Sequence, residues 1–529
     1  MKKIGFQKTY LILFFIVLLG FFLRVYKLDK NGLWSDEQWC VTASVGVKYN
    51  MFDKVNFFNE WASPWRDSWW KSDTTWKVKN DFTSSDFWKY NTPAYVLKAT
   101  IFTGNNPAYN ISLHYWIKIF GLSDFSVRFF SALWGILVVF LAFPFAKILF
   151  NSNKIALFAT FLIAIHPLLI IESQSVKAHS MAIFFSFLST FLFLKIIKGK
   201  ESKLILTGYI VACTLALLTH MLTIYVLLGH ILIMLFFIRE KMLWMKLGLA
   251  GLIVSALYSI WLFNGGFESL KFLGAFTEFI KSNVNNPRWS GHLFFISFAP
   301  ANYMRAVETM ILGLFGNTLY NKVYTNELRL RDLVVLFFIP VMMMMIGYFK
   351  TRNRGDRKEL WILIVMLLAQ FLFATVMAYK DNQMMQFGPL NTVHVVPYVM
   401  LLFAAISYKV LEGKGIIKKL FSLFLIFQVG IMLYSTSQIY FNERDQGYDF
   451  VKTPNLYRAA ANSIISSYQE KDTVIFQEWR IAQCTNLYLK NAPYILQKVD
   501  TTISRKGKIW LSKNKSENRI ELFDLGNWR

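Results

Sequence analysis

The fold is decided by the stretch Arg24-Val25-Tyr26-Lys27-Leu28-Asp29-Lys30-Asn31-Gly32-Leu33-Trp34-Ser35-Asp36-Glu37, which directly follows an apolar run from Tyr10 to Leu23. With its flanks, that run is long enough to span a bilayer. Asp36 and Glu37 then come a few residues beyond the membrane exit. A carboxylate at this boundary can act as a general base while a lipid-borne group lies in the bilayer beside it. The alternative is that both carboxylates are solvated loop charges, and the local sequence alone does not separate the two interpretations.

The composition is that of an all-α polytopic membrane protein. The chain has 529 residues, of which 55% are hydrophobic and 17% charged, and its mean hydropathy is +0.37. Several apolar runs have the length of a transmembrane helix. The first run lacks a small-residue cleavage site and continues into Arg24 and Tyr26. We therefore expect an uncleaved first span and not a signal peptide.

The formal net charge is +25, yet the basic residues are spread over the loops that flank the apolar runs. No basic stripe with interleaved aromatic residues lies on a soluble module, so nucleic acid is not an expected partner. Membrane topology accounts for much of this excess of positive charge, because basic residues gather in the inner loops. The remainder suits membrane lipids, either through anionic headgroups or through a lipid phosphate.

We expect eleven spans, which lie near residues 10–28, 126–150, 155–171, 179–197, 204–219, 222–238, 246–263, 331–349, 359–379, 391–409 and 418–438. With the N-terminus inside, the short basic loops fall on the inner side, at residues 151–154, 198–203, 239–246, 350–358 and 409–419. This is the positive-inside pattern. It predicts a multi-pass protein with its N-terminus inside, and we expect that protein in the plasma (inner) membrane.

The segments expected outside are long and rich in Trp, Asn and Asp. They are residues 29–125, residues 264–330 and the polar segment 440–529. Within the second, residues 295–316 are apolar but contain Arg305 and Glu308, and an extra span there would invert every later loop. We expect interfacial helices in these outer segments.

The C-terminal segment has the composition of a small extracytoplasmic α/β domain. Residues 454–468 read as a helix, and residues 472–476 and 508–511 read as strands. We therefore divide the chain into a transmembrane domain, 1–439, which includes the outer loops 29–125 and 264–330, and a domain over 440–529.

Two cationic positions lie beside outer span ends. The turn Ile171–His179 contains Glu172 and Lys177, and Arg128 lies at the outer start of the second span. A cation there can bind a phosphate group. The alternatives are a snorkelling lysine with a structural glutamate partner, and an arginine that only caps the membrane boundary.

His220 and His394 lie near the outer ends of other spans. Each is more often a packing or turn residue than a ligand. Together with Glu37 or Glu172 they could bind a divalent metal, although their spacing matches no standard zinc motif. We expect no other cofactor. The three cysteines imply no disulfide framework, and a bridge between Cys40 and Cys484 is left open.

Several pieces, in this order, resemble the GT-C glycosyltransferases of the family 39 type, which include protein O-mannosyltransferases, the lipid A aminoarabinose transferase and lipopolysaccharide-core sugar transferases. The stretches that carry the resemblance are Leu33–Glu37, Asn106–Asn110, Trp116–Gly135, His166–His179 and Leu218–His220. It is clearest over residues 20–235. The later spans and the C-terminal segment match mainly in layout.

The resemblance implies the GT-C fold and a hexosyl or pentosyl transfer with inversion. Its donor is a polyprenyl-phosphate sugar, and its acceptor is an envelope glycolipid, glycan or protein on the extracytoplasmic face. The family's catalytic acid carries over to Asp36, with Glu37 beside it, and the arginine after its first interfacial helix carries over to Arg128. The family's Gln-Glu-Ala-Arg-x-Tyr turn reads Gln174–His179 here, with lysine and histidine at its last two conserved positions.

The chemistry requires cations at the leaving phosphate, because charge develops there during transfer. On this interpretation Arg128, Lys177 and His179 bind the donor phosphate, and Asp36 accepts the proton of the acceptor hydroxyl.

Two other functions stay open from the sequence. The first is a transporter of lipid-linked sugars, although the two halves of the chain are not alike and the polar residues gather in outer loops. The second is a non-catalytic GT-C-like envelope protein, which the altered turn Gln174–His179 would suit.

Overall fold

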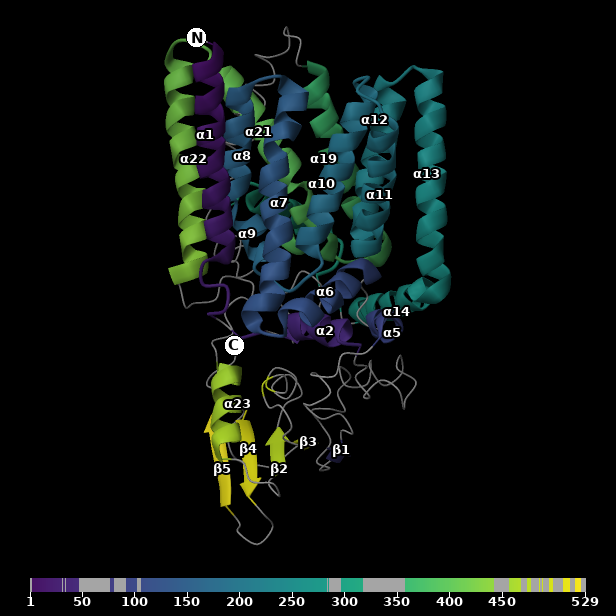
Figure 1. Cartoon of the computed structure of the whole chain (residues 1–529), viewed down its shortest axis with the longest axis vertical. Helices are drawn as coiled ribbons and strands as arrows, with labels where there is room; N and C mark the ends of the chain where they lie inside the picture. Colours follow the sequence, from purple (N-terminus) through teal and green to yellow (C-terminus); the bar gives the residue numbers. More distant parts are fainter. Residues whose placement is uncertain are drawn as a thin grey trace. The chain divides into compact units, whose positions relative to one another are not determined.

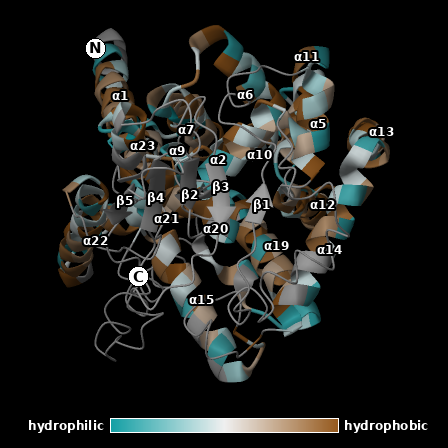
Figure 2. Cartoon of the chain, turned by 90° about the horizontal axis from the view of Figure 1, so that it is seen from below, coloured by the Kyte–Doolittle hydropathy of each residue, from teal (hydrophilic) through white to brown (hydrophobic). Residues whose placement is uncertain are grey.

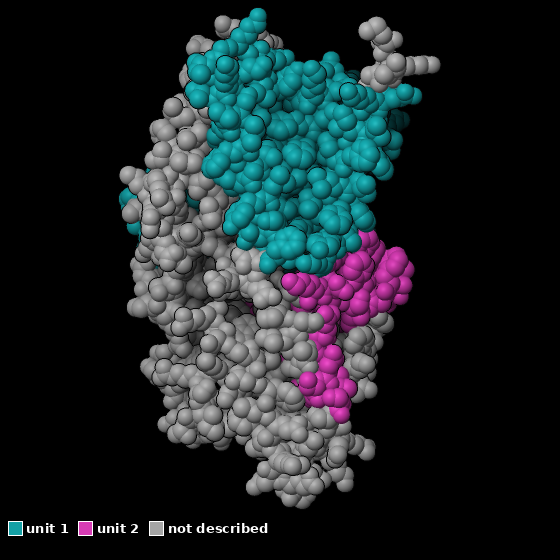
Figure 3. Space-filling model, turned by 90° about the vertical axis from the view of Figure 1, so that its left-hand side faces the viewer, with its two compact units in different colours: residues 1–27, 131–264, 276–447 teal, residues 28–130, 265–275, 448–529 magenta. Residues whose placement is uncertain are grey.

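The computed structural model describes residues 2–30, 32–33, 35–46, 77–79, 92–101, 106–282, 284, 296–316, 357–441, 456–467, 473–476, 485, 488, 494–497, 508–513 and 519–524. The chain divides into two compact units, which Figure 3 separates by colour. Unit 1 comprises residues 1–27, 131–264 and 276–447, and unit 2 comprises residues 28–130, 265–275 and 448–529. Each unit is described by itself.

Unit 1 is helical throughout its described part. Its helices are α1 (Lys2–Val25), most of α7 (Asp124–Phe150), α8 (Asn153–Ile165), α9 (Pro167–Ser173), α10 (His179–Ile197), α11 (Lys203–Thr219), α12 (Ile224–Phe237), α13 (Lys241–Trp261), part of α14 (Phe267–Ser282), α15 (Pro300–Leu314), α19 (Arg357–Asp381), α20 (Pro389–Thr392), α21 (Val396–Leu411) and α22 (Ile416–Phe441). The long ones stand side by side in Figure 1.

The prediction of a polytopic helical membrane protein is confirmed. Seven helices in the described residues are long and apolar enough to cross a membrane, or eight if α8 and α9 together form one span. Two shorter apolar helices, Lys203–Thr219 and Met221–Phe237, lie where spans five and six were expected. The expected span 331–349 falls outside the described residues. The count of eleven spans therefore stays a prediction.

One expected span is broken. The sequence predicted a continuous helix over 155–171, but α8 and α9 meet at an angle of 57°. Pro167 has no N–H to continue the ladder of α8, and it disfavours the helical conformation at the residue before it. His166 accordingly has an extended backbone, with φ −69° and ψ 118°. Its Nε2 lies 3.2 Å from the carbonyl oxygen of Leu314, near the end of α15.

The helices of unit 1 differ in how much of their surface they expose. α10 and α21 are buried along most of their length, and Phe145 of α7 stacks on Phe187 of α10 with ring centroids 4.3 Å apart. α1, α13 and α22 instead expose rows of large apolar side chains, and brown apolar residues are prominent along α13 and α22 in Figure 2. Apolar surface of this extent suits contact with lipid.

The apolar piece 295–316 forms α15, a helix of 15 residues. Its length is about 22 Å at 1.5 Å per residue, which is less than the hydrocarbon thickness of a bilayer. That this piece is not a span stays a prediction. Its place at the membrane interface stays a prediction.

Unit 2 combines short helices with a five-stranded sheet. The helices are α2 (Ser35–Ser44), α5 (Pro93–Ile101), α6 (Pro107–Phe120), the first turns of α7, and α23 (Leu456–Ser467). The strands are β1 (Lys77–Lys79), β2 (Thr473–Phe476), β3 (Tyr494–Gln497), β4 (Lys508–Lys513) and β5 (Arg519–Asp524). The sheet order is β1-β3-β2-β4-β5. β2 and β3 are parallel, and the other neighbours are antiparallel.

The helix and the two strands expected in the C-terminal segment are confirmed as α23, β2 and β4. The sequence analysis missed β1, β3 and β5. β1 belongs to the outer loop 29–125 and pairs with β3, so that loop and the C-terminal segment share one sheet. The division into 1–439 and 440–529 stays a prediction, to which the structure adds this link.

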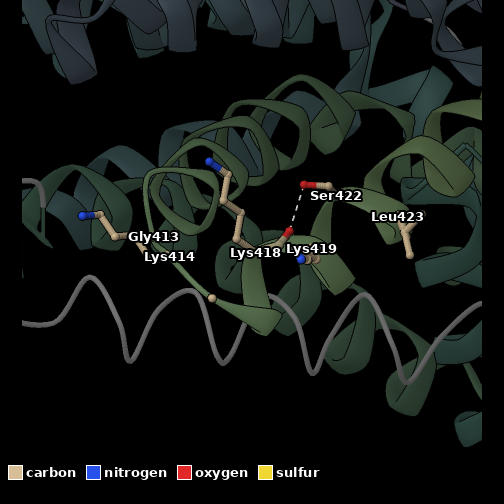
Figure 4. A pocket seen from close by; sticks show the side chains of 7 residues that line it. Gly413, Lys414, Lys418, Lys419, Ser422 and Leu423 are labelled. Atoms are coloured by element: carbon tan, nitrogen blue, oxygen red, sulfur yellow. Dashed lines mark hydrogen bonds between the residues drawn. The ribbon is translucent and has the colours of Figure 1, made fainter.

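A hollow of about 630 Å³ lies at the turn between α21 and α22 (Figure 4). It is lined by Gly413, Lys414, Gly415, Lys418, Lys419, Ser422 and Leu423. The turn belongs to a loop expected on the inner side of the membrane. It is therefore not a candidate for the outer-face chemistry.

Candidate functional site

The Asp36–Glu37 pair lies in the first turn of α2. Carboxylates are favoured there because the helix dipole presents unpaired N–H groups at its N-terminus. The amide of Gln38 donates to the carbonyl oxygen of Leu33 at 3.2 Å, which ties the helix to the preceding chain. Cys40, in the same helix, is buried, and Cys484 lies outside the described residues, so the bridge between them left open by the sequence stays open.

The two neighbouring carboxylates have different surroundings. Glu37 is 1% exposed and forms a bidentate pair with Arg128, whose Nε and Nη2 donate to its two oxygens at 2.9 and 2.6 Å. Such a fork is a strong, oriented contact. Asp36, in contrast, is partly exposed. A proton acceptor for an incoming substrate has to be accessible, so the geometry distinguishes Asp36 from Glu37.

Arg128 also binds the chain that leads into α2. Its Nη1 donates to the carbonyl oxygen of Leu28 at 3.0 Å, and its Nη2 donates to that of Gly32 at 2.9 Å. Both Arg128 and Glu37 are buried. This geometry favours a role for Arg128 in holding Glu37 and residues 28–32. Its predicted contact with the donor phosphate stays a prediction.

A second carboxylate, Asp124, lies one turn before Arg128 in α7. It is 6% exposed and is bonded by two residues of the C-terminal segment. The hydroxyl of Tyr488 donates to its Oδ1 at 2.8 Å, and Nη1 of Arg458 donates to its Oδ2 at 3.1 Å. Burial raises the pKa of Tyr488 above its usual range, so the hydroxyl keeps the proton that it donates.

The far end of α2 is held by α6. Nδ1 of His114 lies 2.8 Å from the carbonyl oxygen of Ser44, and the amide of Asn110 donates to the hydroxyl of Thr100 in α5 at 3.0 Å. Pro107 at the first position of α6 presets its backbone for the helix. α2 is thus fixed at both ends by polar contacts.

The predicted phosphate turn lies in unit 1, between α9 and α10. Gln174 donates to the carbonyl oxygens of Leu23 and Tyr26 at 3.2 Å, which holds the turn to the end of α1. Lys177 is partly exposed and lies close enough to Glu172 and His179 for electrostatic interaction. The Glu172 side chain is 2% exposed.

Three histidines gather beside this turn. The ring of His179 lies 4.9 Å from that of His220 and 5.8 Å from that of His394, and the last two are 5.4 Å apart. His179 and His394 are 8% and 1% exposed, and both ring nitrogens of His394 lack a hydrogen-bond partner among the described residues. Nδ1 of His220 accepts the N–H of Leu222, as expected of a turn residue.

As placed, no group of three or more metal-ligating side chains in the described part of the chain could hold a metal ion. The alternative of a divalent metal at His220, His394 and Glu172 therefore gains no support from their geometry.

The structure thus gathers the predicted residues into two clusters. Glu37 and Arg128 meet in unit 2, with Asp36 beside them, and Lys177, His179, His220, His394 and Glu172 gather in unit 1. The sequence analysis missed the roles of Asp124, Tyr488 and Arg458. Asp124 stood in the stretch that carried the family resemblance, but nothing local indicated partners more than 300 residues away.

Residues 106–261 match the family described as dolichyl-phosphate-mannose-protein mannosyltransferase. No curated protein sequence matches the chain.

Among solved structures, the chain is similar to ArnT from Cupriavidus metallidurans in the apo state, with 13% identity, a TM-score of 0.53, and coverage of 93% of this chain and 86% of that one. ArnT bound to undecaprenyl phosphate gives 12% identity, a TM-score of 0.52, and coverage of 91% and 84%. The oligosaccharyltransferase of Archaeoglobus fulgidus tethered with an acceptor peptide gives 14% identity, a TM-score of 0.51, and coverage of 92% and 63%.

These likenesses confirm the GT-C resemblance at the level of the fold. The chain is a multi-pass membrane protein with the architecture of GT-C glycosyltransferases. At 12–14% identity these structures show the fold alone, so the chemistry has to be argued from the residues.

Proposed function

We propose that this protein is a glycosyltransferase that moves a hexosyl or pentosyl group from a polyprenyl-phosphate donor to a cell-envelope acceptor. The transfer takes place on the extracytoplasmic face of the plasma (inner) membrane. The acceptor is a glycolipid, a glycan or a protein. Support comes from the GT-C fold, the match over residues 106–261, and the solved complex of the similar ArnT with undecaprenyl phosphate.

Asp36 is the general base in this proposal. The oxygen of the acceptor hydroxyl forms a bond to the anomeric carbon, the bond from that carbon to the phosphate oxygen breaks, and the proton passes to Asp36. The phosphate leaves on its lipid. One direct displacement inverts the anomeric configuration. Glu37 does not take the proton, because Arg128 occupies both of its oxygens.

Lys177 and His179 bind the donor phosphate in this proposal. His220 and His394 lie beside them and supply further ring nitrogens to the same site. Lys177 interacts electrostatically with His179 and His220, and the ring centroids of the three histidines lie within 6 Å of one another. Ring N–H groups and an ammonium are the donors that a phosphate requires as charge develops on it. The two ring nitrogens of the buried His394 have no hydrogen-bond partner in the described part of the chain, and they are available for such a ligand.

The observation that carries the proposal is the difference in burial and binding partners between the two adjacent carboxylates. Glu37 is buried and bound by Arg128, while Asp36 is partly exposed in the same helical turn. A pair of solvated loop charges would not require a buried, bidentate arginine for one of its members.

The proposal is tested by mass spectrometry of envelope glycans and glycolipids from cells with and without the protein. Cells that lack it should lose one sugar modification and regain it when the wild-type chain is restored. An unchanged glycan and glycolipid profile would contradict the proposal.

A further inference from the structure

The C-terminal segment of the chain binds the carboxylate of Asp124 through two side chains. Tyr488 donates to one oxygen at 2.8 Å, and Arg458 donates to the other at 3.1 Å. All three residues belong to unit 2. Asp124 is therefore a junction between the first turn of α7 and a part of the chain more than 300 residues further on.

The same two side chains also bond the chain that leads into α2. The hydroxyl of Tyr488 accepts the backbone N–H of Leu33 at 2.9 Å. Nη2 of Arg458 donates to the carbonyl oxygen of Asp29 at 3.3 Å. Tyr488 thus uses its hydroxyl as donor and acceptor at once, and it bridges α7 to a residue three positions before Asp36.

Arg128 completes the arrangement from the next turn of α7. It bonds the carbonyl oxygens of Leu28 and Gly32 and both oxygens of Glu37. The approach to α2 is therefore held at residues 28, 29, 32 and 33, by side chains of α7 and of the C-terminal segment. A loop restrained at so many points keeps the helix start that follows it in one place.

We infer that Tyr488 is a positioning residue for the transfer reaction, which with Asp124 and Arg458 fixes the turn that carries Asp36 and Glu37. This inference rests on the proposed function for its catalytic consequence. A misplacement of about 1 Å at a reacting group can cost a hundredfold in rate. The C-terminal segment then contributes to turnover without touching the substrate.

Tyr488 contributes more to this positioning than Arg458. The carboxylate of Asp124 is buried, and Tyr488 is itself partly buried. The side chain of Arg458 is 32% exposed. Exposed ion pairs contribute little, because water screens them and the long side chain has to be ordered.

The test replaces Tyr488 by phenylalanine, which removes the hydroxyl and keeps the ring. The matched control is Tyr95→Phe in α5 of the same unit. The ring of Tyr95 is half exposed, and its hydroxyl has no hydrogen bond within the described residues. Hydrogen–deuterium exchange of residues 28–44 is measured in both variants and in the wild type, with α11 as an internal reference.

Tyr488→Phe should speed exchange over residues 28–44, leave α11 unchanged, and lower kcat about tenfold with KM for the donor retained. Tyr95→Phe should behave as the wild type. A purely structural role would lower the amount of folded protein and leave kcat of the folded fraction intact. That outcome, or unchanged exchange over residues 28–44, would overturn the inference.

Arg458→Met provides a second test if Tyr488→Phe does not fold, because Arg458 lies nearer the surface. Arg458→Met should speed exchange over residues 28–44 less than Tyr488→Phe does. Arg458→Lys keeps a positive charge beside Asp124, so its effect on exchange should be smaller than that of Arg458→Met. No effect of either change on residues 28–44 would contradict the inference. Hydrogen–deuterium exchange does not depend on turnover. A wild-type protein that transfers no sugar would therefore disprove the proposed function, while the exchange of residues 28–44 would still show whether Tyr488 and Arg458 restrain this segment.

Discussion

Glu37 and Asp36 are adjacent in the chain but differ in what surrounds them. Both could be recognised in the sequence as carboxylates at a membrane exit, and Arg128 could be recognised as a cation at another. That Arg128 binds Glu37 could not be predicted, because the two residues are 91 positions apart and no local pattern relates them. The pairing adds a role for Arg128 as the partner of Glu37, and its contact with the donor phosphate stays a prediction.

At the residue scale, Lys177→Ala should weaken binding of a polyprenyl phosphate. A charge-assisted contact is worth roughly 1.5–3 kcal/mol, which corresponds to a Kd about 10 to 100 times higher. Titration with a short-chain polyprenyl phosphate measures this. The control is Lys200→Ala, which removes an exposed lysine from a loop expected inside. Equal affinity in both variants would remove Lys177 from the phosphate site.

At the scale of elements, the apolar runs predicted the long helices well. The sequence pattern predicted two of the five described strands and missed β1, β3 and β5. A run of about 20 apolar residues has few alternatives to a helix in a membrane, so the described spans agree within a few residues. His166-Pro167 was interpreted as the end of a span, but the span drawn over 155–171 ran past it, and the bend between α8 and α9 was not predicted. β1 has only three residues and draws its stability from β3, so its own sequence carries no usable alternation.

Another prediction concerns the packing of α7 against α1 and α9. A Cβ atom added at Gly135 would overlap the Ser173 side chain and lie 3.0 Å from Nε of Arg24. Arg24 is buried and donates to the carbonyl oxygens of Ala164 and Ile163, so it cannot move freely. Gly135→Ala should therefore destabilise unit 1 by about 1–3 kcal/mol, as overpacking does.

Thermal unfolding of the purified protein checks this, with Gly430→Ala in α22 as the control. A Cβ at Gly430 meets none of the described residues within 4 Å, so that change should be neutral or slightly stabilising. If Gly135→Ala has the same Tm as Gly430→Ala, then α7 does not pack closely against Ser173 and Arg24 at Gly135.

At the scale of the whole molecule, α7 contributes residues to both units, and the C-terminal segment shares unit 2 with the first outer loop. The sequence suggested a C-terminal domain of its own, because composition changes near residue 440. It could not indicate that β1 of the first outer loop enters the same sheet, since strand pairing between distant segments has no local signature.

Topology is the prediction that belongs to this scale. An accessibility tag at Arg354 should be cytoplasmic, and one after Arg529 should be extracytoplasmic, because the inner loops are short and basic and the expected number of spans is odd. A tag after Arg529 that reports the cytoplasm would require an even number of spans and would put the active site and the C-terminal segment on different sides.

The central claim is that Asp36 is the base of a lipid-linked sugar transfer. The most direct measurement is turnover of purified protein with a polyprenyl-phosphate sugar and an envelope extract as acceptor. Asp36→Asn keeps the shape and removes the basicity, so transfer should fall by a factor on the order of 10²–10⁴ while donor binding is retained. Wild-type turnover by Asp36→Asn would contradict the account, and an inactive Glu37→Gln beside it would assign the base to the other carboxylate.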